Sequence, residues 1–164
     1  MVKELLVYPD DRIRVVSADV RSFDDDLKQL VQNMKDTMEA NSAKALAAIQ
    51  IAVPATVVIY KEEDGSFLEL INPRIIGTTG TQETQEEALY MPTFSTPLTR
   101  YGTIKVIYQD IEGKQQSLDV DGEKSALIQR KIDYTFGGTL IDKLDKKARK
   151  QAEKFLRKWE KSNR

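Results

Sequence analysis

The sequence contains no cysteine and no histidine. Without cysteine the chain has no disulfide, no thiol nucleophile and no thiolate ligand for a metal. Without histidine it lacks the commonest general base and the commonest ligand of transition metals. A zinc or iron site would have to be built from carboxylates, and oxygen-only sites suit magnesium, calcium or manganese better.

Long apolar runs are also missing, so no segment of the sequence predicts a membrane span. The first residues include an acid, Glu4, and soon reach the turn at Tyr8-Pro9, which does not fit a secretory signal. The chain has 164 residues, of which 40 % are hydrophobic and 31 % are charged, values typical of one compact domain. We therefore expect a cytoplasmic protein with no membrane association.

The charges are unevenly distributed along the chain. The net charge is −1, but residues 145–164 hold nine Lys/Arg and three Asp/Glu, a net charge of +6, and the rest carries −7. A basic tail on an acidic body predicts a polyanionic partner for the tail. A helix face that is simply solvated explains the same charges, so both interpretations stay open.

The first half of the chain predicts one helix and one hairpin. Ser22 and Asp24 are typical capping residues at a helix start. Apolar residues follow at helical spacing: Leu27, Leu30, Val31, Met34 and Met38. Residues 56–60 and 67–71 are β-rich, and Asp64-Gly65 between them indicates a hairpin turn.

The second half predicts a further hairpin and two helices. Residues 104–109 and 116–120 form the second strand pair, joined through residues 112–114. A helix over 123–136 is ended by Gly137-Gly138. The basic tail predicts a third helix with an apolar stripe: Ala148, Ala152, Phe155, Leu156 and Trp159. One helix, several antiparallel strands and two more helices make an α+β arrangement.

Three short segments resemble, in order and spacing, the motifs of the peptide deformylase family. Residues 43–50, AKALAAIQ, are similar to the first motif, GxGLAAxQ. Gln50 is kept, Ala43 and Ala45 replace the two glycines, and Lys44 replaces a residue that is usually apolar. Two added methyl groups change a segment where glycine permits close approach to a ligand.

The other two motifs match with their functional residues replaced. Residues 86–90 are similar to EGCLS, with Ala88 in place of the cysteine, and residues 130–134 are similar to HExxH. Arg130 and Tyr134 stand where the family has histidines, and Lys131 stands where it has glutamate. The resemblance implies that all three metal ligands and the general base are missing.

The resemblance implies a fold and a domain organisation. Family members are metal-dependent hydrolases that remove the formyl group from the N-terminal formyl-methionine of new proteins. We expect the α+β peptide-deformylase-like fold, with antiparallel sheets around a central helix, residues 123–136, and a C-terminal helix. Residues 1–144 form the family domain, and residues 145–164 form a basic helix packed on it.

The same resemblance predicts a homologue that is catalytically inactive and binds a peptide, a nascent chain or another partner. No cofactor is expected, because the iron or zinc site of the family is lost. The degenerate catalytic positions are Gln50, Ala88, Leu89, Arg130, Lys131 and Tyr134. The expected substrate cleft is lined by Ala43, Lys44, Ala45, Gln50, Glu87, Leu89, Tyr90, Leu127, Arg130 and Tyr134. Arg130 is expected to replace the positive charge of the metal by pairing with Glu86 or Glu87, unless these side chains point to water.

Two further functions stay open. In some bacterial deformylases a C-terminal helix contacts the ribosome, and the tail offers similar residues: Lys146, Lys147, Arg149, Lys150, Lys154, Arg157, Lys158 and Lys161. An enzyme could also reuse the cleft for metal-independent or carboxylate-metal hydrolysis, including residual deformylase activity. Its candidate groups are Glu86, Glu87, Lys131, Asp133 and Tyr134, whereas Ser95 and Ser125 have no histidine to activate them.

Overall fold

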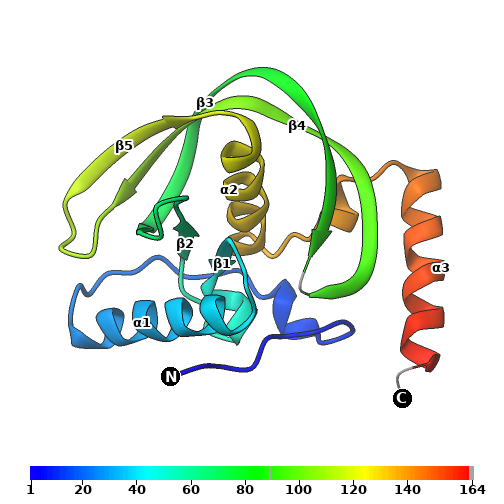
Figure 1. Ribbon diagram of the computed structural model, residues 1–164, viewed down its shortest axis with the longest axis horizontal. Helices are drawn as coiled ribbons and strands as arrows, with labels where there is room; N and C mark the ends of the chain where they lie inside the picture. The colour runs from blue at the N-terminus through cyan, green and yellow to red at the C-terminus, as the bar shows by residue number, and fades with distance from the viewer. Residues whose placement is uncertain (89, 163–164) are drawn as a thin grey trace.

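A curved antiparallel sheet wraps around one helix in the computed structural model, which describes residues 1–88 and 90–162 (Figure 1). The helices are α1 (Asp25–Ala40), α2 (Gly122–Thr135) and α3 (Lys146–Ser162), with 3-10 helices η1 (Asp11–Arg14), η2 (Ala48–Ile51) and η3 (Leu140–Lys143). The strands are β1 (Ala45–Ala47), β2 (Val57–Lys61), β3 (Phe67–Ala88), β4 (Met91–Gln109) and β5 (Gln115–Val120). They form a single sheet in the order β1-β2-β3-β4-β5, in which every pair is antiparallel.

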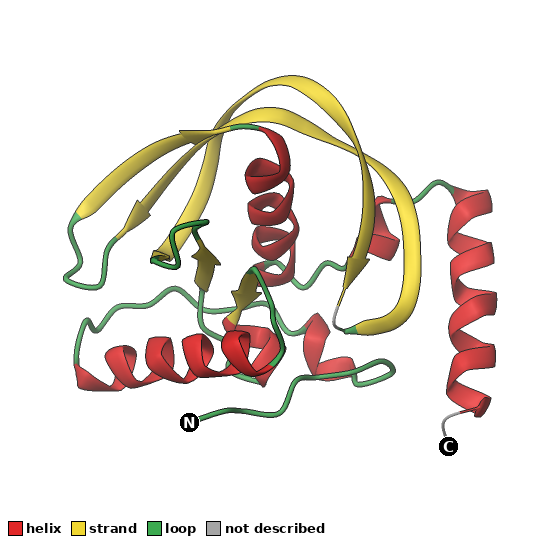
Figure 2. Cartoon of the chain, viewed as in Figure 1, coloured by secondary structure: helices red, strands yellow, loops and turns green. Residues whose placement is uncertain are grey.

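The long hairpin of β3 and β4 dominates the sheet and curves over α2 (Figure 2). The sequence predicts only its ends, residues 67–71 and 104–109, because a pair such as Asn72-Pro73 usually ends a strand. The strand instead continues through this point, where the register shifts between Ile71 and Arg74. An irregularity of this kind tolerates both the positive φ of Asn72 (53°) and the proline.

Helix α1 confirms the prediction from the apolar spacing. The side chain of Asp24 accepts a hydrogen bond from the backbone N–H of Leu27 at 3.1 Å, so the expected residue caps the helix. Residues Leu27, Val31, Met34 and Met38 are buried, and they share one apolar cluster with residues of β2. The hairpin turn predicted at Asp64-Gly65 is also present, between β2 and β3.

Helix α2 lies inside the arch of the sheet, at the position expected for the central helix (Figure 1). Ile128 and Ile132 belong to the larger hydrophobic cluster of the protein. The helix ends at Thr135, and the chain then turns at Gly137, whose φ is +80° and where a Cβ atom would lie 2.5 Å from the backbone oxygen of Arg14. Only glycine combines this left-handed conformation with so close an approach.

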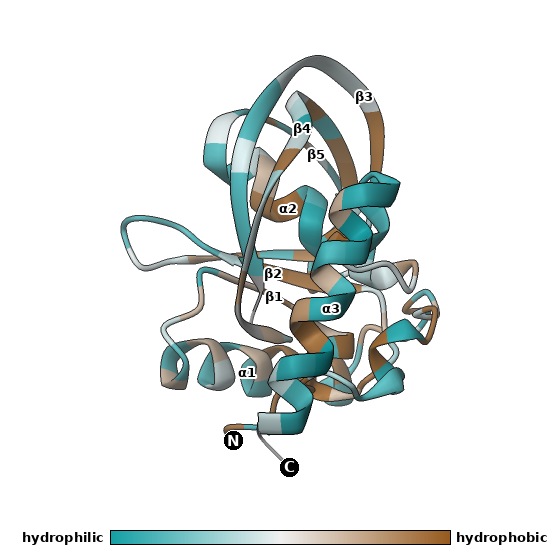
Figure 3. Ribbon diagram, turned by 90° about the vertical axis from the view of Figure 1, so that its right-hand side faces the viewer, coloured by the Kyte–Doolittle hydropathy of each residue, from teal (hydrophilic) through white to brown (hydrophobic). Residues whose placement is uncertain are grey.

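Helix α3 stands beside the β3–β4 hairpin and presents a mostly hydrophilic outer face (Figure 3). Ala152 and Leu156, each 1 % exposed, belong to the same cluster as the core of α2. The ring of Phe155 lies 5.5 Å from that of Phe94, although Phe155 remains partly exposed. The boundary at residue 144 between the family domain and the basic helix stays a prediction.

Within the part of the chain that the structure describes, no helix has the length and apolar content needed to cross a membrane.

Candidate functional site

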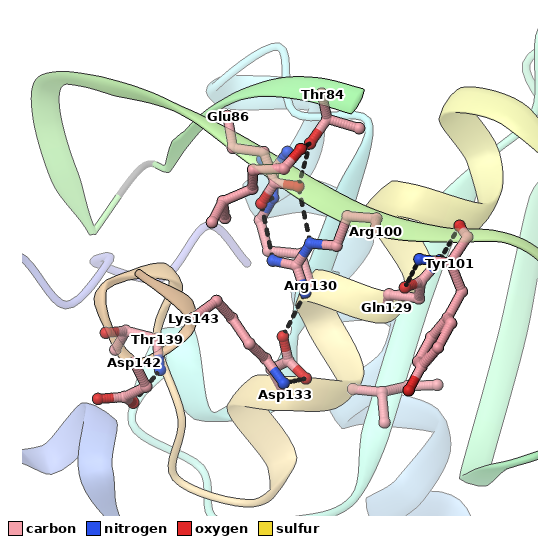
Figure 4. A network of polar contacts seen from close by, with 12 residues as sticks. Thr84, Glu86, Arg100, Tyr101, Gln129, Arg130, Asp133, Thr139, Asp142 and Lys143 are labelled. Carbon is pink, nitrogen blue, oxygen red and sulfur yellow. Dashed lines mark hydrogen bonds and ion pairs between the residues drawn. The ribbon is translucent and has the colours of Figure 1, made fainter. Parts of the chain in front are cut away.

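The second and third motifs meet at a buried carboxylate, Glu86, near the end of β3 (Figure 4). Arg100 on β4 binds it with two hydrogen bonds, from Nε to Oε2 and from Nη2 to Oε1, both 2.7 Å long. The hydroxyl of Thr84 also donates to Oε2 at 2.7 Å. Glu86 and Arg100 have side chains that are 0 % and 4 % exposed, so this is a desolvated, bidentate ion pair.

Arg130 on α2 completes the arrangement around this carboxylate. Its Nε atom lies 3.1 Å from Oε1 of Glu86, and its Nη1 atom donates to the backbone oxygen of Glu87 at 2.5 Å. The ion pair expected between Arg130 and one of two glutamates is therefore formed with Glu86. Glu87 contributes its backbone oxygen, and its side chain is exposed.

Sequence reasoning missed Arg100, which lies outside all three motifs. Besides binding Glu86, its Nη1 atom donates to Oδ2 of Asp133 at 2.6 Å, and Lys143 approaches the same aspartate at 3.6 Å. Two buried or half-buried carboxylates thus face two guanidinium groups, with one ammonium at the rim. No local pattern in the sequence marks Arg100, because its partners come from another part of the hairpin and from α2.

Electrostatics stabilise the charged forms of this network. Burial by itself would raise the pKa of Glu86, but hydrogen bonds and charge from Arg100, together with Thr84 and Arg130, hold that pKa below its ordinary value. Burial would likewise lower the pKa of Arg100, and the carboxylates of Glu86 and Asp133 raise it instead. The network therefore stays ionised and forms a rigid polar centre between the hairpin and α2.

Lys131, which follows Arg130 on α2, is buried in a different environment. Its side chain is 4 % exposed, and its ammonium lies 5.2 Å from the centre of the Tyr134 ring. Among the described residues the ammonium has no hydrogen-bond or ion-pair partner. Burial, with a smaller contribution from Arg130 and an opposing one from Glu86, lowers the pKa of Lys131 to about 7. A large part of this amine is therefore neutral near pH 7 and able to accept a proton.

Two other buried polar atoms at the motif positions lack a partner within residues 1–88 and 90–162. One is the hydroxyl of Tyr134, whose pKa is raised by burial. The other is Nε2 of Gln50, whose Oε1 atom accepts a hydrogen bond from the backbone N–H of Ala47 at 3.0 Å. Since buried polar groups are usually satisfied, these atoms are candidates for contact with a ligand.

The first motif forms one edge of the sheet. The edge strand β1 pairs only with β2, and Lys61 donates its backbone N–H to the backbone oxygen of Lys44 at 2.8 Å. In an antiparallel pair this leaves the backbone groups of Ala45 pointing away from β2. The side chain of Lys44 is exposed and forms an ion pair of 3.0 Å with Glu123 of α2. Ala43 is half-buried.

The remaining residues predicted to line the cleft lie in different environments. Tyr90 was expected in the cleft, but its hydroxyl donates to the backbone oxygen of Asp10 at 3.0 Å, so this side chain fastens the N-terminal segment. Leu127 is half-buried against the main hydrophobic cluster. Leu89 and the side chain of Ala88 lie outside the described part of the chain.

Comparisons with known proteins agree over nearly the whole length. The sequence model of the family described as Polypeptide deformylase matches residues 2–150. A curated protein named peptide deformylase from Nautilia profundicola is 33 % identical over 170 residues, which cover 99 % of this chain and 98 % of the relative. The peptide deformylase of Nitrosococcus oceani is 35 % identical over 162 residues, which cover 95 % and 97 %.

Solved structures give the same result. The crystal structure of a peptide deformylase from Legionella pneumophila superposes with a TM-score of 0.90 at 27 % identity, covering 99 % of this chain and 98 % of that one. The Ehrlichia chaffeensis peptide deformylase in complex with actinonin matches with the same TM-score, identity and coverage. These matches confirm the predicted peptide-deformylase-like fold with its C-terminal helix.

The comparisons overturn one prediction. Because Ala88, Arg130 and Tyr134 replace the ligands of the family, the sequence predicted no metal cofactor and a lost iron or zinc site. The matched family is metal-dependent, its relatives here are named for the deformylase, and none of these findings shows that a metal site has been lost. The three replaced residues correspond to one set of metal ligands only. Oxygen atoms elsewhere in a fold can also hold a cation, so the replacements by themselves do not exclude a metal ion.

The described side chains at the motif positions do not themselves fit the ion of the family. A guanidinium at Arg130 and an amine at Lys131 repel a cation or compete with it, and the hydroxyl of Tyr134 has its pKa raised, which keeps it protonated. Within the described ranges no three His, Cys, Asp or Glu residues gather in a way that could hold a metal. These side chains therefore assign no chemical step to a metal ion.

Proposed function

Because the chain belongs to the polypeptide deformylase family, we propose that it is a peptide-binding homologue with little or no deformylase turnover. It holds the N-terminal end of a peptide between the free edge of β1 and the face of α2 that carries Arg130.

The ion network around Glu86 is the observation that carries this proposal. Arg130 stands at the first histidine position of the third motif, and its guanidinium is committed to Glu86 and to the backbone of Glu87. Removing such a group from its buried partner costs several kcal/mol, about 3–5 kcal/mol in comparable pairs. The side chain of Arg130 is therefore held in a fixed position, where it can contact a bound peptide but does not activate water.

Two features of the residues between β1 and α2 support peptide binding. The edge of β1 offers the backbone groups of Ala45 on the side away from β2, and an extended peptide can pair with such an edge. The unpartnered Nε2 of Gln50 is a buried donor that a ligand carbonyl would satisfy. The ligand class implied is an N-terminal peptide segment, formylated or free.

A cytoplasmic location for this protein remains a prediction.

The test combines turnover and binding on the pure protein. Formyl-Met-Ala-Ser is incubated with ferrous iron, nickel or cobalt, and bound metal is measured on the same samples by mass spectrometry of metals. We expect turnover no higher than a metal-only blank, together with saturable binding of the labelled peptide in fluorescence anisotropy. Metal-dependent turnover above the blank would overturn the proposal. Turnover that survives chelation and is lost in Lys131→Met would also overturn it, in favour of an enzyme that uses the buried amine.

A second candidate function rests on α3. The eight basic residues of this helix are all exposed, while Ala152 and Leu156 pack its opposite side against the core. This arrangement supports contact with the phosphate backbone of ribosomal RNA, which releases counterions and depends steeply on salt.

Co-sedimentation with ribosomes tests this contact. We expect binding at about 50 mM salt that falls by an order of magnitude or more by about 200 mM. It should be weakened in Lys150→Glu/Lys158→Glu and kept in the matched variant Lys28→Glu/Lys105→Glu, which reverses two exposed charges elsewhere. Equal binding by both double variants would refute the proposed contact between α3 and the ribosome.

A further inference from the structure

A hollow of about 320 Å³ lies where α3 meets the N-terminal segment and η3. Three guanidinium groups line it, those of Arg14 in η1 and of Arg149 and Arg157 in α3. The remaining lining residues are Tyr8, Ile141, Glu153 and Leu156. We call these seven residues the arginine hollow. Its lining holds three positive side chains and a single carboxylate, so it favours an anion.

Two of the three arginines are held in place by one carboxylate, that of Asp142 in η3. Its Oδ2 atom pairs with Nη1 of Arg14, and its Oδ1 atom lies 3.2 Å from Nη2 of Arg149. Asp142 also accepts the backbone N–H of Thr139 at 2.9 Å. Burial by itself would raise the pKa of Asp142, but this N–H and the two arginines hold that pKa below its ordinary value. The carboxylate therefore stays charged and fixes both guanidinium groups beside the hollow.

These contacts occupy only part of the donors of the two arginines. A guanidinium group has five N–H donors. Arg14 uses Nη1 alone, for Asp142 and for the backbone oxygen of Gly137 at 3.4 Å. Arg149 uses Nη2 for Asp142 and turns Nε toward Glu153, at 3.7 Å. The side chains of Arg14 and Arg149 are 45 % and 47 % exposed, so a ligand can reach the donors that remain.

The third arginine, Arg157, has all its donors available. Within residues 1–88 and 90–162 no hydrogen bond or ion pair involves this exposed side chain. Arg149, Glu153 and Arg157 follow one another at a spacing of four residues along one side of α3. Arg157 therefore lies about two helical turns from Arg149, on the same side of the helix and at the other end of the hollow.

The chemistry of the hollow suits a phosphate group. The planar fork of arginine matches the oxygen atoms of phosphate, and such contacts are often bidentate. A phosphate monoester carries a charge of about −1.5 to −2 near pH 7 and three acceptor oxygens, enough for three guanidinium groups. Tyr8 adds an aromatic wall, because its ring packs edge-on against that of Tyr90 with the centroids 6.2 Å apart. The volume lies at the lower end of the range of small-molecule sites, roughly 300–1,000 Å³, which limits the size of the ligand.

We propose that the arginine hollow binds the phosphate group of a small phosphate monoester. This inference goes beyond the proposed function, because the hollow shares no residue with the cleft between β1 and α2 and does not need a bound peptide. It also differs from a contact between the outer face of α3 and RNA, since Lys150 and Lys158 do not line the hollow.

The experiment titrates the full-length, isotope-labelled protein with inorganic phosphate and with glycerol 2-phosphate, while sodium chloride keeps the ionic strength constant. Nuclear magnetic resonance follows the Nε–Hε signals of the arginine side chains. We expect saturable shifts for Arg14, Arg149 and Arg157, and none of comparable size for the exposed Arg21. Arg157→Gln should weaken binding by about fivefold, the upper range for a partly exposed ion pair. Arg157→Lys should weaken it less, because lysine keeps the charge and loses the fork.

Arg157 has no partner among the described residues, so neither substitution should change the melting temperature. The matched control is Arg21→Gln/Lys105→Gln, which removes two exposed positive charges elsewhere and should bind phosphate like the wild-type protein. Shifts that do not saturate, or equal affinity of Arg157→Gln and the wild type, would refute the phosphate site. Binding of ribosomes without binding of phosphate would also refute it and would assign these arginines to contact with RNA. Peptide binding is measured on the same samples, and its failure would count against the proposed function alone.

Discussion

Replacing Lys131 by methionine should stabilise the protein in a way that depends on pH. The pKa of this buried amine is about 7 in the folded protein, against 10.5 for an ordinary lysine. Between these values the unfolded chain binds more protons than the folded one, so the free energy of unfolding of the wild-type protein rises with pH. The cost of burying the ammonium is present in full below pH 7 and is relieved as the pH rises.

The size of the change in the free energy of unfolding depends on the difference between the two pKa values of Lys131. Each pH unit between the two pKa values changes the free energy of unfolding by about 1.4 kcal/mol, so roughly 2–3 kcal/mol is recovered between pH 7 and pH 9. Lys131→Met keeps a similar shape and removes this titration. Its advantage over the wild-type protein should be greatest below pH 7 and should shrink by that amount by pH 9.

Urea unfolding at pH 6, 7, 8 and 9 measures the difference, provided that both proteins unfold with the same slope in denaturant. Lys28→Met is the matched control. Lys28 is exposed on α1, so the same substitution there removes an ammonium group that is already in contact with water. Its curve should run parallel to that of the wild-type protein. A difference between Lys131→Met and the wild type that stays constant from pH 6 to pH 9 would refute the reasoning.

Three further predictions concern the network, a helix end and the docking of α3. Glu86→Ala leaves Arg100 buried without its main partner and should cost about 3–5 kcal/mol in urea unfolding, and a loss below about 1 kcal/mol would contradict the network. Gly137→Ala and Gly80→Ala both place alanine at positive φ, at a cost of about 1 kcal/mol, but only the first also meets a backbone oxygen at 2.5 Å. Gly137→Ala should therefore lower the melting temperature more, and equal shifts would count against the clash. Leu156→Ala should cost about 2–5 kcal/mol, because this residue of α3 is 1 % exposed, and a neutral effect would show that α3 does not depend on the core.

Local patterns in the sequence predicted the helices well. Asp24 and the spacing of Leu27, Val31 and Met38 located α1, since a cap and a 3.6-residue period depend only on neighbouring residues. The β3–β4 hairpin was predicted at its two ends alone. Its middle passes through Asn72-Pro73, a pair that normally ends a strand, and only pairing with β4 shows that the sheet continues.

The candidate site was predicted in part. The sequence predicted that Arg130 pairs with either Glu86 or Glu87, and only the structure shows that the partner is Glu86. Arg100 was missed, and Tyr90 was assigned to the cleft although it contacts the N-terminal segment. The prediction that no metal cofactor is used was wrong, because it treated three replaced residues as a description of the whole protein.

Residue types and local spacing were enough to establish the family, the order of the helices and the absence of thiol and imidazole chemistry. Which charges meet depends instead on the folded chain. Glu86 is 14 residues from Arg100 and 44 from Arg130, and these side chains come together only through the register of the hairpin and the position of α2 beneath it. The same packing buried Lys131 and left the hydroxyl of Tyr134 without a partner among the described residues, because burial is a property of the folded chain and not of any one residue in it.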